Sequence, residues 1–566
     1  MDSLHYDPLD FYNQNLKLKH QQNVEDCFNE LTQRSGIDVE ANRKTVARYK
    51  EKLSSIDKTR KKTFWLGFLR AAMIVTAVLG VVLSIGLASE SPYMPIILLP
   101  IAILLTVLVF VSINPKIKKL KGSLQEEEAQ AKKIYGEAME QMAPLNASFD
   151  EKMTLSLFEK SMPLFHFSEN FTEEMSLDLR QNFDMPTYDD PETSVIATLS
   201  GKYNENPFVY IRRLIHQMGT ETYHGYRVIS WTESYTDSEG KRRTRTRTQT
   251  LHAQVVKPKP YYSVDTRLHF GAQAAPDLSF NREGNNINEK SDGAIERYVK
   301  RGERKNAKRT GRALSKGESF MAMTNSEFDV LFGATDRNHE VQFRLMFTPL
   351  AQTNMVELIL SDDTYGDDFD FCKKKRHNVI RSDHAQLWDM NTSPEKYRSY
   401  SYDEAKRKFE SFNNNYLKSV YFDFAPLLAI PAYQDDLKAG KTPIKKPEQS
   451  FANEEYEAMA NAIGASYFSH GATRTDTILK ANYSFTDTGE ENISVDAHSY
   501  TTENRIDIIP VFGGDGRMHN VTVPWVEYIP LYRNSTMYVR SLREDEKGGK
   551  ADFIGAIKDK IISYIK

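Results

Sequence analysis

Hydrophobic positions follow three patterns along the chain. Two long apolar runs lie at residues 64–88 and 93–113, segments with helical spacing flank them, and strand-like alternation dominates much of the second half. Because strands and helices come in separate blocks and not in regular alternation, the sequence predicts an α+β fold. We predict five regions: N-terminal helices at 1–62, a two-span transmembrane helical hairpin at 63–115, a helical stalk at 116–165, a large mixed α+β region at 166–440 with antiparallel β-hairpins, and a β-rich region at 441–566 that ends in a helix at 551–565.

The two apolar runs are long enough to cross a bilayer. Residues 71–89 form a stretch of 19 uncharged residues and residues 91–115 a stretch of 25, with only Glu90 between them. A bilayer core needs about 20 apolar residues as a helix, so each run predicts one membrane span. The alternative is a pair of buried helices in a soluble protein, but charge-free runs of this length argue against it.

Charges beside the runs predict the orientation of the spans. Lys and Arg crowd residues 43–62 and 116–121, whereas the break between the spans, residues 88–93, contains neither. Positive flanks stay in the cytoplasm, so we expect both termini inside and the break outside. The side chains expected at the membrane interface are Lys61, Lys62, Trp65, Arg70, Lys116, Lys118 and Lys119.

Charge and cysteine content narrow the expected ligands and the cellular compartment. The formal net charge is −3, so the chain has no global affinity for nucleic acid and any basic function must be local. Only two cysteines occur, Cys27 and Cys372, which favours a reducing compartment. Residues 1–20 lack the basic start and apolar core of a signal peptide. We therefore expect an integral membrane protein with most of its mass in the cytoplasm, and a bacterial plasma membrane as its address.

Helical segments adjoin both sides of the predicted spans. Residues 16–35 and 38–62, separated by Gly36, and residues 116–142 all favour helix. The two helices next to the membrane enter and leave it side by side, which predicts a short antiparallel stalk with a thin apolar seam and not a long coiled coil. This stalk is either a spacer or oligomerisation element, or a pair of helices that packs on the soluble region.

The clearest strand pattern in the chain is a β-hairpin over residues 223–256. Strict alternation runs from Arg243 to Val255, and residues 237–240 form the turn. A three-residue loop predicts a register that sets Glu233 opposite Arg245 as an ion pair.

The same register sets Trp231 opposite Arg247, which predicts a cation–π contact. The row of Arg243, Arg245 and Arg247 has two interpretations. It is a binding finger for phosphate or an acidic partner, or it is a solvated ribbon whose charges discourage edge pairing.

A second basic feature is the segment 297–317. At helical spacing one face carries residues 297, 301, 304, 308 and 312, while Gly302 and Gly311 interrupt the weak opposite face. The segment is a solvated loop, or it binds anionic lipid at the membrane that anchors the chain. Nucleic acid is the less favoured ligand because aromatic residues that stack bases are sparse. The candidate binding residues are Arg297, Lys300, Arg301, Arg304, Lys305, Lys308, Arg309 and Arg312.

Shorter elements are predicted elsewhere. The pattern indicates a short helix or apolar element at 207–219, core at 325–360, helices at 403–420 and 453–464, a linker at 438–450, and five strands between 477 and 542 with a turn at Gly513–Gly516.

No motif in the sequence names an activity. It contains no phosphate-binding loop, no Cys-x-x-Cys and no nucleophile elbow. Residues 362–377 hold five Asp before four basic residues, which predicts an exposed loop with internal charge pairs. Cationic neighbours predict a lowered pKa for Cys372. We expect no metal or cofactor, and we expect ordinary surface or core roles for His216, His224, His252 and His269.

We therefore predict a membrane-anchored, cytosol-facing binding or scaffold protein and not an enzyme, with an unknown protein partner and a possible homo-oligomer. The alternative is an enzyme at the membrane surface that acts on a phosphate-bearing substrate. Convergence of acidic, basic and His side chains in one deep pocket favours the enzyme, and exposed basic or aromatic patches favour the binding protein.

Overall fold

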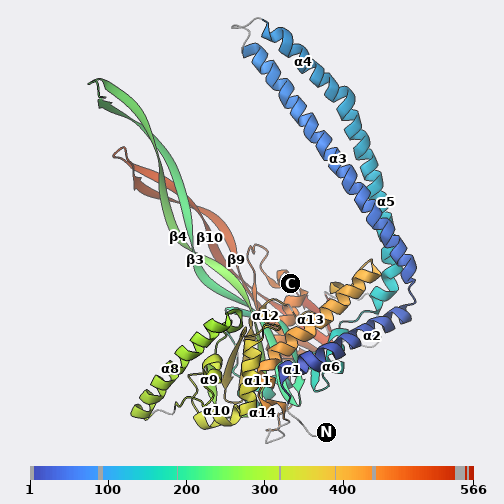
Figure 1. Ribbon diagram of the computed structural model, residues 1–566, viewed down its shortest axis with the longest axis vertical. Helices are drawn as coiled ribbons and strands as arrows, with labels where there is room; N and C mark the ends of the chain where they lie inside the picture. Colours follow the sequence, from blue (N-terminus) through green and yellow to red (C-terminus); the bar gives the residue numbers. More distant parts are fainter. Residues whose placement is uncertain are drawn as a thin grey trace. The chain divides into compact units, whose positions relative to one another are not determined.

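The computed structural model describes residues 6–86, 93–187, 189–236, 238–317, 320–388, 390–435, 442–487, 489–541, 555–557 and 560–565. It is a mixed α+β protein with antiparallel sheets and two long apolar helices in its N-terminal part (Figure 1). The chain forms two compact units. The helical unit contains Lys19–Leu157 and Thr392–Tyr416, and the α+β unit contains Met1–Leu18, Phe158–Asn391 and Leu417–Lys566. The boundaries of the five regions expected from the sequence stay a prediction.

The helical unit is built on the predicted helices. Gly36, with a φ of 63°, separates helix α2 (Lys17–Ser35) from α3 (Val39–Gly86), because glycine adopts the left-handed conformation without strain. Helix α3 runs without interruption from the polar flank through the first apolar run. The second run is continuous through α4 (Met94–Leu108), the π-helix η2 (Val109–Ile113) and α5 (Asn114–Ser148).

Helices α3 and α5 form the antiparallel pair that the sequence predicts. Their seam is thin, and ion pairs between Arg48 and Glu137 at 2.9 Å and between Arg60 and Glu128 at 3.0 Å line its polar side. Helix α2 and the C-terminal end of α5 pack with α6 (Met153–Ser161), η4 (Pro394–Lys396) and the first half of α13 (Tyr402–Leu428) around a phenylalanine-rich core. This core, and not the seam, holds most of the apolar contacts of the unit. Its buried aromatic members are Phe28, Phe149, Tyr397, Tyr402 and Phe409.

The α+β unit contains a seven-stranded antiparallel sheet in the order β1-β2-β3-β4-β7-β6-β5. Helices pack on it and extend from it, and α13 ends against it (Figure 1). The strands are β1 (Phe165–Ser168), β2 (Thr193–Tyr203), β3 (Asn206–Thr236), β4 (Arg242–Gly271), β5 (Ser279–Arg282), β6 (Phe369–Lys374) and β7 (His377–Ser382). The other elements before α13 are α1 (Pro8–Phe11), η1 (Tyr12–Leu16), α7 (Glu173–Phe183), η3 (Ile287–Glu289), α8 (Asp292–Lys316), α9 (Ser326–Phe332), α10 (Glu340–Met346), α11 (Pro349–Leu360) and α12 (Asp383–Gln386).

A second sheet has the order β11-β12-β10-β9-β8 and follows α14 (Pro431–Gln434), α15 (Asn453–Ile463) and α16 (Ala465–Phe468). The five strands predicted here merge into β8 (Ile478–Asp487), β9 (Glu490–Phe512) and β10 (Met518–Ser541), and the predicted Gly-rich turn joins β9 to β10. The helices predicted at 403–420 and 453–464 are confirmed by α13 and α15.

Two secondary-structure predictions are wrong. Residues 207–219 belong to strand β3, because an apolar run fits either element and the pairing of β3 with both β2 and β4 decides between them. The described part of the C-terminal segment forms β11 (Gly555–Ile557) and β12 (Lys560–Ile565) and not a helix. Strand β12 pairs with the end of β10. The sequence pattern does not show that β10 offers an edge for this pairing.

Two long β-hairpins extend beyond their sheets and lie side by side (Figure 1). We call β3/β4 the first ribbon and β9/β10 the second ribbon. They are joined by a small apolar layer in which Ile229, Leu251 and Ala253 of the first ribbon meet Val521 and Val523 of the second. The hairpin predicted over 223–256 is therefore longer than expected, and it is supported along one face by another hairpin.

Candidate functional site

The two apolar helices have the length and composition of membrane spans. The most apolar 18-residue window has a mean hydropathy of 2.3 within Val39–Ile85 and of 3.1 within Ile96–Ser148. Only 11% and 17% of these windows is buried, whereas a core helix of a soluble protein is mostly buried. The contact between the helices is narrow and includes Gly80 near Ala102, where small residues let the backbones approach. These helices are therefore apolar on surfaces that the protein itself does not cover.

The side chains predicted at the membrane interface lie where the apolar stretch of each helix meets its polar part. Trp65 is exposed and packs edge-on against Phe64 and Phe68, which makes an aromatic cluster at one end of the apolar stretch. Lys61 forms an ion pair with Asp57 at 2.8 Å. The remaining predicted interface residues, which are Lys62, Arg70, Lys116, Lys118 and Lys119, are also exposed.

The register predicted for the first ribbon is confirmed. Glu233 lies opposite Arg245 and Trp231 lies opposite Arg247. The ion pair between Arg245 and Glu233 is present at 3.1 Å. Arg247, however, is 2.7 Å from the same Glu233, and the guanidinium that lies over a ring is that of Arg245, 5.4 Å from the centre of Tyr235. The Arg row is thus exposed but partly neutralised by one carboxylate, which weakens it as an anion-binding finger.

The basic segment 297–317 is a continuous helix, α8, and not a disordered loop. Gly317 ends the helix in a left-handed conformation with a φ of 73°. Figure 1 shows α8 at the periphery of the α+β unit, next to α9. Its first turn begins with Asp292, where a negative charge favours a helix N-terminus.

Gly302, one of the two glycines that interrupt this helix in the sequence, packs α8 against α9 together with Asn306. A Cβ on Gly302 would lie 2.3 Å from a methyl carbon of Val330, so only glycine permits this close approach. One turn further on, the Asn306 amide donates a hydrogen bond to Asp329 at 3.0 Å, and Asp329 in turn binds the buried Arg337 at 2.7 Å. Sequence reasoning missed these contacts because Gly302 and Asn306 show no apolar periodicity.

Packing on one side leaves the basic side of α8 in solvent. At 100° per residue Gly302, Asn306 and Ala313 cluster toward α9, and the basic residues occupy most of the opposite half. Every candidate binding residue from Arg297 to Arg312 is exposed. Arg309 is the member nearest the packed side, and its guanidinium lies 4.5 Å from the centre of the Phe320 ring. Glu296 forms an i,i+4 ion pair with Lys300 at 2.5 Å.

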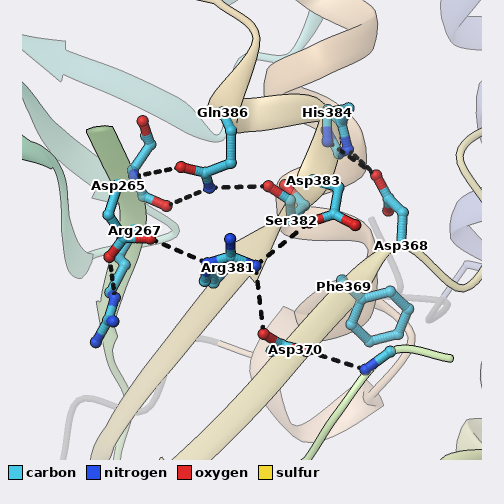
Figure 2. Close-up of polar contacts among 12 residues, drawn as sticks. Asp265, Arg267, Asp368, Phe369, Asp370, Arg381, Ser382, Asp383, His384 and Gln386 are labelled. Carbon is cyan, nitrogen blue, oxygen red and sulfur yellow. Dashed lines mark hydrogen bonds and ion pairs between the residues drawn. The ribbon is translucent and has the colours of Figure 1, made fainter. Parts of the chain in front are cut away.

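A polar cluster joins β6, β7 and α12 to α13 (Figure 2). His384 lies between two carboxylates, with Nδ1 2.6 Å from Asp368 and Nε2 3.3 Å from Asp423. Burial raises the pKa of Asp423 to about 6, although His384 opposes this shift. Burial alone lowers the pKa of His384, but the charges of Asp423 and Asp368 outweigh burial and raise it above its ordinary value.

This cluster does not have the geometry of a catalytic triad. The Ser382 hydroxyl donates to Asp423 and not to His384, and Nε2 of His384 also lies 3.0 Å from the Ser419 carbonyl oxygen. The imidazole stacks flat on Tyr365, with ring centres 3.8 Å apart. Both ring nitrogens are therefore occupied, and neither can take a proton from a nucleophile. The cluster ties secondary-structure elements together.

Beside it, Arg381 collects three carboxylates (Figure 2). It lies 3.0 Å from Asp265, 3.6 Å from Asp370 and 3.3 Å from Asp383. Asp265 also accepts a hydrogen bond from Arg267 at 2.6 Å. Each of its carboxylates binds a guanidinium at a partly exposed surface, so this is a structural ion-pair network that joins β4 to β7.

The expectations for residues 362–377 are wrong. The segment enters strand β6, and Asp367 is buried in an ion pair with the fully buried Arg282, whose guanidinium lies 3.8 Å from the centre of the Phe369 ring. Burial raises the pKa of the Cys372 thiol, and the charge of Asp336 adds to that rise, so Cys372 is not a lowered-pKa thiol. Tertiary partners override the cationic neighbours in the sequence.

The histidines form two close pairs. His224 and His252 lie 2.8 Å apart on the exposed face of the first ribbon, and His269 and His377 lie 3.1 Å apart in the core. Burial lowers the pKa of His377 to about 4. Within the described residues there is no group of three or more His, Cys, Asp or Glu side chains arranged to hold a metal ion.

Sequence reasoning also missed a charged cavity of about 100 Å³ where α15 meets β2 and β8. Its acidic and basic side chains pair locally, with Glu454 3.0 Å from Arg180 and Glu457 2.8 Å from Lys480. Burial raises the pKa of Glu457 to about 7, although Lys480 opposes the shift. The acidic start of the segment 453–464 was the available signal. Because these charges neutralise one another, we regard the cavity as part of the joint between the sheets.

No family model, curated protein or solved structure matches this chain.

Proposed function

We propose that this chain is a membrane-anchored binding protein. The two apolar helices cross the membrane, both termini lie in the cytoplasm, and helix α8 docks the α+β unit on anionic lipid headgroups. The observation that carries the proposal is the exposed basic face of α8. The contacts of Gly302 and Asn306 with α9 fix the opposite face of the helix and so keep the basic face turned to solvent. A bacterial plasma membrane is the address that we expect.

The exposed apolar surface of α3 and α4 supports the anchor. Large side chains such as Phe68, Val82 and Leu104 are about half exposed or more, and burying such side chains in lipid stabilises them by about 1.5–3 kcal/mol each. The polar flanks carry the Lys and Arg excess that favours the cytoplasmic side. A reducing cytoplasm also fits Cys27 and Cys372, which form no disulfide.

Charge supports anionic lipid as the ligand of α8. Helix α8 carries nine Lys and Arg residues against three acidic residues, and Asp292 and Glu296 both lie in its first two turns. Each Lys or Arg close to an anionic leaflet contributes on the order of 1 kcal/mol. The anchor keeps this helix near such a surface at high effective concentration. Exposed aromatic rings that would stack bases are sparse on α8, where Tyr298 stands among basic residues, so nucleic acid is less favoured.

The enzyme alternative has less support. His384 and the carboxylates beside it bind one another, and the pairs around Glu454 and Glu457 are likewise internal. The Arg row of the first ribbon shares Glu233 and has no pocket of its own among the described cavities. The proposal also allows a protein partner that binds the ribbons in addition to the lipid.

The anchor is tested with a thiol reagent that does not cross membranes. We expect Ser91→Cys, in a chain that also carries Cys27→Ser and Cys372→Ser, to react in intact cells. The matched control is the natural chain, whose two cysteines should react only after the cells are opened and the protein is unfolded. Labelling of the natural cysteines from outside, or recovery of the natural chain without detergent, would overturn the proposed topology.

Lipid docking is tested on the full chain in liposomes. A fluorophore at Ala307→Cys, in the same Cys-free background, should be quenched by headgroup-labelled lipid when anionic lipid is added to a neutral bilayer. Changing Arg301, Arg304 and Lys308 to Gln should weaken docking roughly 100-fold, at about 1 kcal/mol each. The control changes Arg243, Arg245 and Arg247 to Gln and removes the same charge from the ribbon. Equal quenching in neutral and anionic bilayers would refute docking by α8.

A further inference from the structure

The second ribbon has an apolar face that nothing in the described structure covers. Its inner face packs on the first ribbon through Val521 and Val523. Side chains alternate along a strand, so the even-numbered residues of β9 and β10 point to the opposite, outer face. Four large apolar side chains on this outer face are 58–66% exposed, namely Ile506, Ile508, Phe512 and Met518.

The register makes these side chains contiguous. Phe512 lies opposite Met518, Ile508 opposite Thr522, and Ile506 opposite Pro524. Directly paired side chains in an antiparallel ribbon are about 5 Å apart. The pair of Pro510 and Asn520 lies between Phe512–Met518 and Ile508–Thr522. The apolar side chains therefore form one strip that runs along β9 through Pro510, with Asn520 and Thr522 of β10 at its edge. Single exposed apolar residues need no explanation, but a contiguous strip of this kind marks an interaction surface.

The strip carries no charge. From Asn504 to Phe512 and from Met518 to Tyr528, the side chains assigned to the outer face are all uncharged. The nearest charged residues point to the other face, where Asp507 binds Lys257 at 2.8 Å and Arg505 binds Glu527 at 2.7 Å. A lipid headgroup, a nucleic acid or a charged peptide finds no partner on such a surface. The occupant must itself be apolar.

We propose that this outer face stacks on the same face of a second copy of the chain, about a two-fold axis near Ile508. An uncharged apolar face can pack on itself without burying an unpaired charge or opposing like charges. Strands that are apolar on both faces belong between two layers, spaced about 10 Å apart. The first ribbon supplies one layer, and the second copy supplies the other. The two-fold axis brings the Phe512 end of one strip onto the slimmer Ile506 and Pro524 end of the other.

A bilayer is a weaker candidate for this face. Segments that enter a membrane carry basic and aromatic residues at their flanks. The turn beside the strip holds Asp515, which lies 2.9 Å from His519, as well as the exposed Arg517. The carboxylate of Asp515, at the leading end of the ribbon, would have to enter the lipid first.

The size of the strip sets the strength of the contact. Four partly exposed side chains offer a few hundred Å², less than the roughly 800 Å² per partner of a standard interface. The association is therefore weak in solution and relies on copies being confined in one membrane. This confinement rests on the proposed anchor, which the thiol-reagent experiment tests separately.

The test is thiol crosslinking of the full chain in its own membrane. In the background with Cys27→Ser and Cys372→Ser, Ile508→Cys should give a crosslinked dimer with a short bifunctional maleimide. The control is Val228→Cys, which is 65% exposed on the outer face of the first ribbon. We expect at least tenfold more dimer from Ile508→Cys than from Val228→Cys. Adding Phe512→Arg to the Ile508→Cys chain should abolish the dimer, whereas Val228→Arg should leave it.

Three outcomes would overturn the proposal. Equal crosslinking at Ile508→Cys and Val228→Cys would mean random collision. A crosslinked product of a mass other than twice that of the chain would mean a different protein partner. Quenching of a fluorophore at Ile508→Cys by spin labels in the acyl chains would place the strip in the bilayer. Hydrogen exchange of the Phe512→Arg chain shows whether the ribbons remain folded, so that loss of crosslinking is not mistaken for unfolding.

Discussion

The contact between the two ribbons depends on one glycine. Gly225 of β3 lies so close to β10 that a Cβ at this position would be 2.2 Å from the carbonyl oxygen of Thr522 and 2.9 Å from its carbonyl carbon. These are backbone atoms, which cannot rotate out of the way. We therefore predict that Gly225→Ala pushes the ribbons apart and opens the layer around Val521 and Val523.

The size of the effect follows from the displacement. Ordinary Cβ contacts lie beyond about 3.4 Å, so the two backbones must separate by about 1 Å. Overpacking of this kind typically costs about 1–3 kcal/mol. If β10 opens locally, its amides should exchange about 5–150-fold faster in the variant, since the exchange rate follows the opening free energy. The measurement is hydrogen exchange of residues 518–526 in the full reconstituted chain.

Gly219→Ala is the matched control on the same strand. Its Cβ would lie 2.8 Å from the half-exposed ring of Tyr261, a side chain that can turn aside, and at an ordinary 3.9 Å from the Lys259 carbonyl oxygen. Alanine also recovers about 0.5–1 kcal/mol that glycine loses in a strand, so we expect little net change. If Gly225→Ala leaves the exchange of β10 within twofold of the natural chain, the ribbons do not meet at Gly225 and the reasoning fails.

Three other predictions concern buried charges. Asp367→Asn should lower the free energy of unfolding in a urea titration by about 3–5 kcal/mol, because Arg282 is left as a buried unpaired charge. The control, Asp383→Asn on the exposed side of the Arg381 network, should change the free energy of unfolding by less than about 1 kcal/mol. The pKa of His384 is raised in the folded protein, so protonated His384 stabilises the fold below about pH 6.5, and this stabilisation is lost as the pH rises through the folded pKa. In urea titrations His384→Gln should therefore lower the free energy of unfolding more at pH 6 than at pH 8. A loss of free energy that is the same at both pH values would contradict this prediction. Lys480→Met should lower the melting temperature more at pH 8 than at pH 6. At pH 6 Glu457, with a pKa of about 7, takes up a proton, so the variant then buries no unpaired charge at this position. Equal shifts in melting temperature at both pH values would refute this prediction.

Local patterns in the sequence were sufficient for much of the fold. The alternation after Arg243 and the turn before it gave the register of the first ribbon, because a hairpin register depends on a short loop and on period-two side chains. Gly36 separated two helices as expected, since its left-handed conformation is a local property of the backbone. The length of the apolar runs likewise depends only on neighbouring residues.

The candidate sites were less predictable. The basic residues of segment 297–317 were visible in the sequence, but its order was not, because Gly302 and Asn306 gain their meaning from Val330 and Asp329 on another helix. We expected ordinary surface or core roles for the histidines, and the sequence did not show that the strands bring His224 to His252 and His269 to His377. Cys372 looked reactive beside its basic neighbours, yet burial in β6 raises its pKa.

The sequence by itself determined the apolar runs, the helices beside them, the first hairpin and the location of positive charge, because these follow from spacing and composition within a few residues. Only the tertiary structure decided which strands pair, that the two ribbons stack, and which face of β9 and β10 remains uncovered. It also decided that charges of residues 362–384 pair with distant residues such as Arg282, Asp265 and Asp423. These outcomes depend on residues hundreds of positions apart. Their energy comes from burial and from ion pairs that exist only after the chain has folded.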